Sequence, residues 1–186
     1  KIRKATLEMS ACGVYYAELN GKPVGDFVLA PGWTVYAKRI QVQSYDVTDL
    51  MERTNTLTVE VASGWYCGNI SRIPAEADHV LKLIALLTVE YEDGKVEIIP
   101  TDESWTVRES KTRFADIYNG EHYDVNFEGV EKPVVIADFP HDRLVPQQGE
   151  KITYQEEIFP KRIITTPAGD KVLDFGQEFT GVIELH

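Results

Sequence analysis

The loop from Asp116 to Asp124 holds the side chains best suited to metal chemistry in this sequence. Asn119 and Glu121 add oxygen donors between the two aspartates, and Gly120 permits a sharp turn among them. Calcium takes about six to eight oxygen ligands and tolerates irregular geometry, so the loop is a candidate calcium site. The alternative is that Asp116 and Glu121 are turn and strand-end residues whose carboxylates accept hydrogen bonds from backbone amides.

Aromatic side chains suggest a second kind of chemistry, the binding of carbohydrate. Trp33 and Trp65 each follow a glycine, which indicates loop tips, and Tyr118 lies in the acidic loop beside Asn119 and Glu121. Sugar rings present C–H faces that stack on aromatic rings, while polar neighbours fix the orientation. These five residues are therefore candidate carbohydrate contacts. The alternative for the two tryptophans is packing in the core or against another domain, because aromatic side chains dominate core packing.

The sequence offers no catalytic residue. Glu121 with Asp124, or Asp102 with Glu103, are pairs of nearby carboxylates. Glycoside hydrolysis by two carboxylates needs a cleft and one raised pKa, and spacing along a strand supplies neither. Nucleophile-elbow, phosphate-loop and dinucleotide-binding motifs are also missing from the sequence.

Composition excludes several classes of protein. A net charge of -11 over 186 residues argues against nucleic-acid binding, which needs a basic surface. The longest apolar run, Leu83–Leu87, is too short to cross a bilayer, so we expect no membrane partner. Cys12 and Cys67 are too few for a disulfide scaffold or a zinc site, and we expect two buried thiols. The sequence shows no secretion leader, which favours a cytoplasmic location.

Strand signals recur along the chain. Asn20-Gly21 and Asp93-Gly94 each separate two apolar runs, the strongest short-range signal for a β-hairpin. Leu57–Val61 alternates apolar and polar residues with the period of a half-buried strand. In Ala77–Tyr91 apolar residues fall on both faces, which predicts a central strand covered on both sides. One short helix is expected, at Asp46–Arg53.

Many short strands separated by Gly, Pro and Asp predict an all-β fold, a β-sandwich of jelly-roll type. We expect this sandwich to span residues 1–132. A linker and further strands follow in residues 133–186. Among them we expect strands at Lys151–Pro160 and Lys161–Thr166.

Three segments resemble one known family. The stretch Leu19–Leu50 (LNGKPVGDFVLAPGWTVYAKRIQVQSYDVTDL), with GWYCG at Gly64–Gly68, resembles the amino-terminal β-sandwich module of bacterial α-L-rhamnosidases, which are glycoside hydrolases. Thr101–Asp124 resembles the Trp-bearing strand, at Asp102–Trp105, and the acidic loop of the same module. Lys171–Leu185 looks like an early strand pair of the following β-sandwich domain, which implies that residues 133–186 hold a linker and the first strands of a truncated second β-sandwich.

This resemblance implies a role as well as a fold. In the family an (α/α) barrel further along the chain performs inverting hydrolysis of terminal α-L-rhamnosyl residues with two acidic residues. The chain alone is then a non-catalytic, structural fragment, with binding of a rhamnose-containing glycan as an added role. Some sugar-binding modules that resemble this one hold L-rhamnose through calcium, which implies Asp116 and Asn119 as metal ligands.

Two alternatives remain open at this point. The first is a stand-alone, calcium-dependent carbohydrate-binding module. The second is the sugar-binding-like domain of a β-galactosidase-type enzyme, because such domains also carry Leu-Asn-Gly and Tyr-Asp-Val-Thr patterns, as at Leu19–Gly21 and Tyr45–Thr48.

Overall fold

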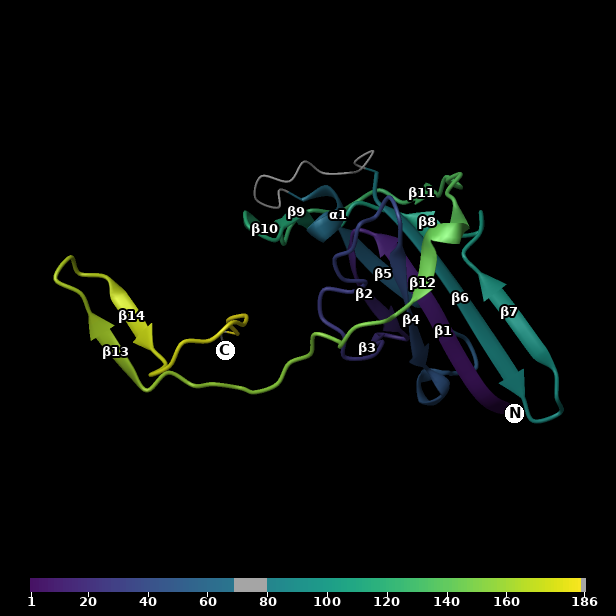
Figure 1. Ribbon diagram of the computed structural model, residues 1–186, viewed down its shortest axis with the longest axis horizontal. Helices are drawn as coiled ribbons and strands as arrows, with labels where there is room; N and C mark the ends of the chain where they lie inside the picture. The colour runs from purple at the N-terminus through teal and green to yellow at the C-terminus, as the bar shows by residue number, and fades with distance from the viewer. Residues whose placement is uncertain (69–79, 185–186) are drawn as a thin grey trace. The chain divides into compact units, whose positions relative to one another are not determined.

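A computed structural model describes residues 1–68 and 80–184 of the chain. Contacts divide the chain into two compact units, Lys1–Thr153 and the part from Tyr154 onward. Strands dominate the first unit (Figure 1). Among the described residues, no helix has the length and apolar character needed to cross a membrane.

The larger sheet of the first unit has five strands in the order β12–β4–β1–β6–β7 (Figure 1). Their bounds are Leu144–Pro146, Ile40–Asp46, Ile2–Cys12, Lys82–Tyr91 and Val96–Pro100. β1 lies antiparallel to both β4 and β6, and β12 runs parallel to β4. β6 lies between β1 and β7, as predicted for a central strand, but only the face with Ala85 and Val89 packs in the core, and Ile84 and Leu86 on the other face are half-buried. Residues 77–79 of the predicted strand lie outside the described residues.

A smaller sheet has the order β3–β2–β5, with bounds Lys22–Pro23, Val14–Leu19 and Leu57–Ala62. Asn20 and Gly21 join β2 to β3 with positive φ angles of 56° and 72°. A two-residue hairpin turn requires such angles, so the prediction at Asn20-Gly21 is confirmed. The turn at Asp93-Gly94 is confirmed as well, because it joins β6 to β7.

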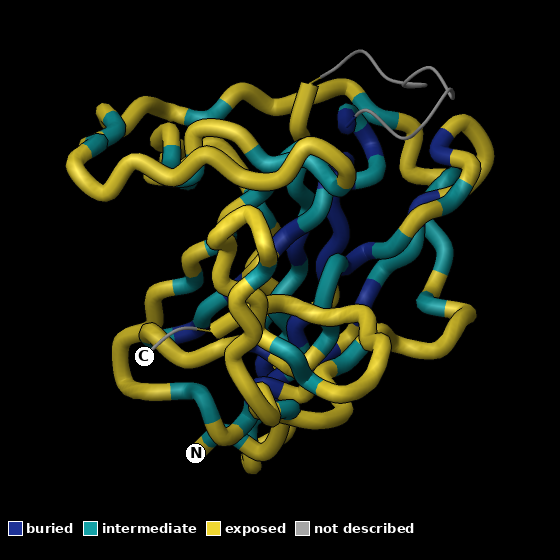
Figure 2. The backbone as a smooth tube through the Cα atoms, turned by 90° about the vertical axis from the view of Figure 1, so that its left-hand side faces the viewer, coloured by how far each residue is buried: buried dark blue, intermediate teal, exposed yellow. Residues whose placement is uncertain are grey.

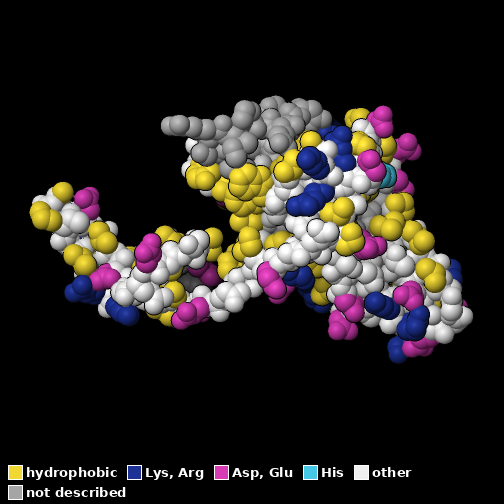
Figure 3. All heavy atoms as spheres, in the orientation of Figure 1, with side chains coloured by type: hydrophobic (Ala, Val, Ile, Leu, Met, Phe, Trp, Pro, Cys, Tyr) yellow, Lys and Arg dark blue, Asp and Glu magenta, His cyan; other side chains and the backbone are white. Residues whose placement is uncertain are grey.

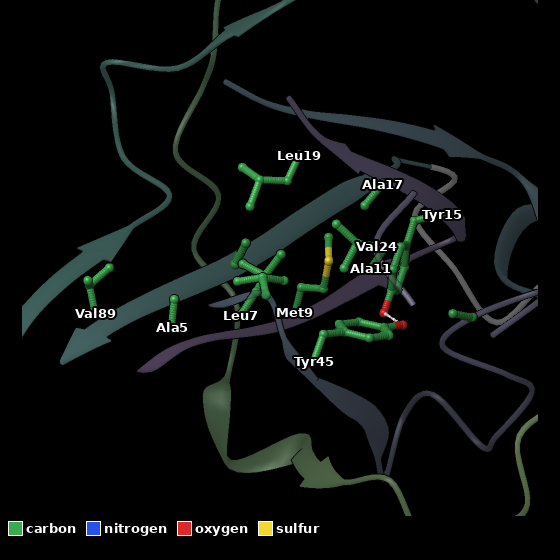
Figure 4. Packing of buried hydrophobic residues seen from close by; sticks show 13 residues of the cluster. Ala5, Leu7, Met9, Ala11, Tyr15, Ala17, Leu19, Val24, Tyr45 and Val89 are labelled. Carbon is green, nitrogen blue, oxygen red and sulfur yellow. Dashed lines mark hydrogen bonds between the residues drawn. The ribbon is translucent and has the colours of Figure 1, made fainter. Parts of the chain in front are cut away.

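The core lies between the two sheets. Its fully buried members include Leu7 and Met9 of β1, Leu19 of β2 and Val89 of β6, and Figure 4 shows these side chains together. Figure 2 shows buried residues gathered in the interior of the first unit and exposed residues along its outside. The predicted all-β sandwich is therefore confirmed.

The predicted helix at Asp46–Arg53 is wrong in extent. β4 continues to Asp46, and only the 3₁₀ turn η1, Thr48–Leu50, follows it. The Asp46 carboxylate accepts hydrogen bonds from the Thr48 amide at 3.0 Å and from its hydroxyl at 2.6 Å. The Asn55 side-chain oxygen then accepts a bond from the Glu52 amide at 2.7 Å. These side-chain bonds replace the backbone bonds that a longer helix would need.

Short strand pairs complete the first unit. β9 and β10, Thr112–Asp116 and Gly120–Tyr123, form one hairpin, and β8 and β11, Thr106–Val107 and Lys132–Pro133, form another pair. The 3₁₀ turn η2 spans His141–Arg143, and the helix α1 spans Gly64–Cys67. The strand predicted at Asp102–Trp105 is wrong, because the Asp102 carboxylate accepts bonds from Ser104 and fixes a turn there.

The second unit contains the hairpin β13–β14, with bounds Arg162–Thr165 and Lys171–Asp174. It matches the strand predicted at Lys161–Thr166, whereas Lys151–Pro160 has no strand. The units divide after Thr153, while the sequence placed the end of the first domain at residue 132. The difference arises because β12 pairs with β4 and so extends the first unit. The assignment of the later residues to a second sandwich stays a prediction.

Candidate functional site

Two aromatic pairs join the loop after Pro31 to helix α1. Trp33 stacks on Trp65 with ring centroids 5.9 Å apart and planes inclined by 8°. Tyr36 meets Tyr66 edge to face, with centroids 5.1 Å apart and planes at 84°. Offset-stacked and edge-to-face arrangements are the favoured geometries of aromatic pairs. The two pairs therefore fix the loop and the helix together and hold the Trp33 ring in one orientation.

The sequence sets this arrangement locally through a glycine. Gly64, at the start of α1, has a φ angle of +46°, and a Cβ atom there would lie 2.2 Å from Cγ1 of Val14. A glycine is thus required both for the backbone conformation and for the close approach of α1 to β2. Helix α1, which carries Trp65 and Tyr66, can pack this closely against β2 because Gly64 has no side chain.

The two tryptophans differ in exposure. Trp33 is 53% exposed, whereas Trp65 is partly buried. The Trp65 indole Nε1 is buried and has no hydrogen-bond partner within the described part of the chain. A buried donor without a partner costs about 1–3 kcal/mol, so this N–H group would gain free energy by donating to an oxygen acceptor.

A small apolar cluster lies beneath the aromatic pairs. Cys12, Tyr36, Ile40 and Tyr66 are its buried members. Cys67 packs against this cluster, and neither cysteine takes part in a disulfide. The Tyr36–Tyr66 pair thus belongs to this cluster, and Trp65 packs against it, which is the alternative given above for that tryptophan.

The acidic loop forms a tight turn between β9 and β10. Oδ1 of Asp116 accepts hydrogen bonds from the Tyr118 amide at 2.9 Å, the Asn119 amide at 2.8 Å and the Asn119 side-chain Nδ2 at 3.0 Å. Gly120 follows with a φ angle of +78°, as a three-residue hairpin loop requires. The Asp116 carboxylate therefore stabilises the turn by accepting these bonds. This is the role that the alternative to calcium binding gave it.

The remaining residues of this hairpin point to solvent. Tyr118 is 66% exposed, and Asn119 and Glu121 are exposed as well. Within residues 1–68 and 80–184, no group of three or more His, Cys, Asp or Glu side chains could hold a metal ion. Calcium binding by Asp116 and Asn119 stays a prediction that this geometry does not favour.

Two of the predicted sites are neighbours. α1 lies against β9, and a Cβ atom added to Gly68, directly after α1, would lie 3.0 Å from Oδ2 of Asp116. The structure thus places the Asp116 turn next to the helix that carries Trp65. Tyr36 and Tyr66 are the site residues that the sequence did not assign. The feature of the sequence that could have identified them is that each tyrosine lies close to a tryptophan in the chain.

In the part of the chain that the structure describes, four carboxylates have a pKa lowered by hydrogen bonds. The Thr48 hydroxyl and amide hold the pKa of Asp46 below its usual value, and the Ser104 hydroxyl and amide do the same for the pKa of Asp102. The pKa values of Glu109 and Asp174 are lowered by hydrogen bonds from Arg113 and Arg162. A general acid for glycoside hydrolysis needs a raised pKa, so none of these four groups is prepared for that role.

The match to a known protein family covers the whole first unit. Residues 1–156 match the family described as "Alpha-L-rhamnosidase N-terminal domain". The chain belongs to the α-L-rhamnosidase family. An α-L-rhamnosidase of Streptomyces avermitilis is 37% identical over 100% of this chain, and one of Alteromonas sp. is 33% identical over 98% of it. The match covers 19% and 22% of those proteins.

Solved α-L-rhamnosidases share the fold of this family member. The Streptomyces avermitilis enzyme, crystallised with L-rhamnose, superimposes with a TM-score of 0.84 and 34% identity over 95% of this chain. The Aspergillus terreus enzyme gives a TM-score of 0.83 and 33% identity over 95% of this chain. The match covers 19% and 22% of those two chains, so this rhamnosidase module spans about a fifth of its relatives.

Proposed function

We propose that the chain is a non-catalytic, accessory module of a longer enzyme that hydrolyses terminal α-L-rhamnosyl residues of plant glycosides or polysaccharides. In this proposal an (α/α) barrel elsewhere in the parent polypeptide breaks the bond by inversion. The observation that carries the proposal is the match over the whole chain to about a fifth of several α-L-rhamnosidases.

A chromogenic assay tests this proposal. The purified chain should release no nitrophenolate from p-nitrophenyl α-L-rhamnopyranoside, whereas the parent enzyme should release it under the same conditions. Release by the chain alone would overturn the non-catalytic role. Failure of the parent to cleave this and related rhamnosides would overturn the family activity assigned to the parent.

A second role, weak sugar binding, is favoured by the Trp33–Trp65 pair. The stack supports the half-exposed Trp33 ring as a fixed, flat apolar surface, and the hairpin with Tyr118, Asn119 and Glu121 adds polar groups beyond α1. Small polar ligands gain little free energy on such an open surface, so we expect a dissociation constant of about 1 mM or weaker.

Calorimetric titration with L-rhamnose distinguishes the versions of this role. Heat of binding that is lost in Trp33→Ala and unchanged by a chelator supports an aromatic contact without metal. Heat that disappears with the chelator supports the calcium-dependent alternative. An absence of heat at 50-fold excess of sugar over ~1 mM protein would leave the module with a structural role only.

A further inference from the structure

A hollow that none of the roles above uses lies between the turn after Asp102 and strand β11. Its volume is about 270 Å³, and it is open to solvent. Pockets for drug-sized ligands measure about 300–1,000 Å³, so this hollow suits a smaller molecule. One wall contains Glu103, Ser104 and Trp105, and the other contains Glu131, Lys132 and Pro133.

Hydrogen bonds hold both walls of the hollow in place. Oδ1 of Asp102 accepts bonds from the Ser104 amide at 2.9 Å and from the Ser104 hydroxyl at 2.5 Å. The Trp105 amide donates to the Asp102 carbonyl at 3.2 Å, and the Val134 amide donates to the Trp105 carbonyl at 3.4 Å. Strands β8 and β11 pair beside this bond. The hollow is therefore formed before any ligand arrives, which lowers the free-energy cost of binding.

The polar groups of the hollow differ in charge. Glu103 and Glu131 contribute carboxylates, Lys132 contributes an ammonium group and Ser104 a hydroxyl. Neither carboxylate forms an ion pair or a hydrogen bond with another residue of the ranges 1–68 and 80–184. Figure 3 shows acidic, basic and apolar side chains intermixed over the part of the first unit where Figure 1 labels β8 and β11.

This mixture of charges favours a neutral ligand with many hydroxyl groups. The two carboxylates repel an anion, and a cation must compete with Lys132 for them. A hydroxyl group can both donate and accept, so it suits a carboxylate and an ammonium group alike. Trp105 adds an indole, which can stack on the C–H face of a sugar ring.

We propose that this hollow binds one neutral sugar ring. In this site the ring stacks on Trp105, its hydroxyls donate to Glu103 and Glu131, and another hydroxyl accepts from Lys132. The site goes beyond the accessory function proposed above, because it requires neither the activity of the parent enzyme nor the Trp33–Trp65 pair. An open site of this size should bind weakly, with a dissociation constant of about 1–10 mM.

Nuclear magnetic resonance of the ¹⁵N-labelled chain tests the proposal directly. The sequence has three tryptophans, so three indole N–H signals are expected. Trp33→Phe and Trp65→Phe assign two of them and leave the third to Trp105. The Trp105 signal should move and saturate on titration with methyl α-L-rhamnopyranoside or methyl β-D-galactopyranoside to ~100 mM. A Trp105 signal that neither sugar moves in a saturable way would overturn the proposal.

Two matched substitutions locate the binding. Glu131→Ala removes a carboxylate of the hollow, whereas Glu128→Ala removes an exposed carboxylate nearby in the chain that does not line it. Both variants should keep the wild-type melting temperature within about 2 °C. Glu131→Ala should weaken sugar binding at least about fivefold, because a hydrogen bond to a charged group is lost. Equal affinities in the two variants would contradict the proposed contacts.

Other probes test the chemical class and the independence of the site. Spermidine or inorganic phosphate that moves the Trp105 signal at lower concentration than either sugar would overturn the neutral class. Trp33→Ala should leave the Trp105 titration unchanged, and its loss in that variant would show that the two sites are not separate.

Rhamnosidase activity of the parent enzyme is measured separately. Sugar binding at Trp105 beside a parent that cleaves no rhamnoside would refute the proposed function and still support this site. A fixed Trp105 signal beside an active parent would do the reverse.

Discussion

The hydroxyls of Tyr15 and Tyr45 lie 2.9 Å apart between the two sheets (Figure 4). Tyr15 donates its hydrogen to Oε1 of Gln43 at 2.8 Å, so Tyr45 must donate to Tyr15. Nε2 of Gln43 in turn donates to the Pro31 carbonyl at 3.3 Å and to Oε1 of Gln147 at 2.6 Å. This buried chain of hydrogen bonds links both sheets to the loop that leads to Trp33 and to the segment after β12.

Substituting Tyr15→Phe should destabilise the first unit. The change removes the donor to Gln43 and the acceptor for Tyr45, and buried polar groups left without partners cost about 1–3 kcal/mol. The free energy of unfolding from urea titration measures the loss. Tyr16→Phe is the matched control, because Tyr16 is exposed and its hydroxyl donates to Oε1 of the exposed neighbour Glu18 at 3.1 Å. Equal losses in the two variants would show that the buried network contributes nothing.

Because of the same tyrosines, the free energy of unfolding should depend on pH in the alkaline range. Burial raises the pKa of Tyr15 and the pKa of Tyr45 above the ordinary value. A group whose pKa is higher in the folded state stabilises the fold below its unfolded pKa, here about 10, and this contribution is lost as pH rises further. Urea midpoints should therefore fall from about pH 10 to 11. The decline should be shallower in Tyr15→Phe/Tyr45→Phe, and parallel curves would contradict the assignment.

Local signals in the sequence were sufficient to predict the hairpins. Asn20 and Gly21 both take positive φ, and the Asn20 side chain also bonds to the Leu50 carbonyl at 2.9 Å and accepts a bond from the Thr56 amide at 2.9 Å. Alternation along Leu57–Val61 predicted β5 because one face of that strand is partly buried and the other is exposed. These features depend on residues close in sequence, which is why pattern and turn chemistry were enough.

Contacts between residues far apart in the chain could not be predicted from the sequence. Nothing near Trp33 or Trp65 indicates that the two rings stack, because their contact depends on how the loop and α1 fold onto the sandwich. Likewise β12 joins β4 although about a hundred residues separate them, and this pairing shifts the end of the first unit. The turns at Asp102 and Asp116 show the other source of difference, which is competition of carboxylates for backbone amides.

Two substitutions at Asp116 separate its turn role from a calcium role. Asp116→Asn keeps a side-chain oxygen for the amides of Tyr118 and Asn119, so we expect a change in unfolding free energy of at most about 0.5 kcal/mol. Asp116→Ala removes the acceptor and should cost about 1 kcal/mol. Melting temperatures in calcium and in chelator should agree for all three proteins. A wild-type protein that calcium stabilises, beside an unresponsive Asp116→Asn, would instead identify a metal site.

Gly64→Ala should disturb the aromatic site more than a glycine substitution elsewhere. Gly94 is the control, because it also has a positive φ, +86°, but a Cβ atom there would meet nothing within 4 Å. Gly94→Ala therefore costs only backbone strain, about 1–2 kcal/mol. Gly64→Ala adds the clash with Val14, at about 1–3 kcal/mol more, and displaces α1. Tryptophan fluorescence should then shift in Gly64→Ala alone, since Trp65 leaves Trp33. Equal stability losses in Gly64→Ala and Gly94→Ala, with unchanged fluorescence, would show that α1 packs against β2 equally well without a glycine at position 64.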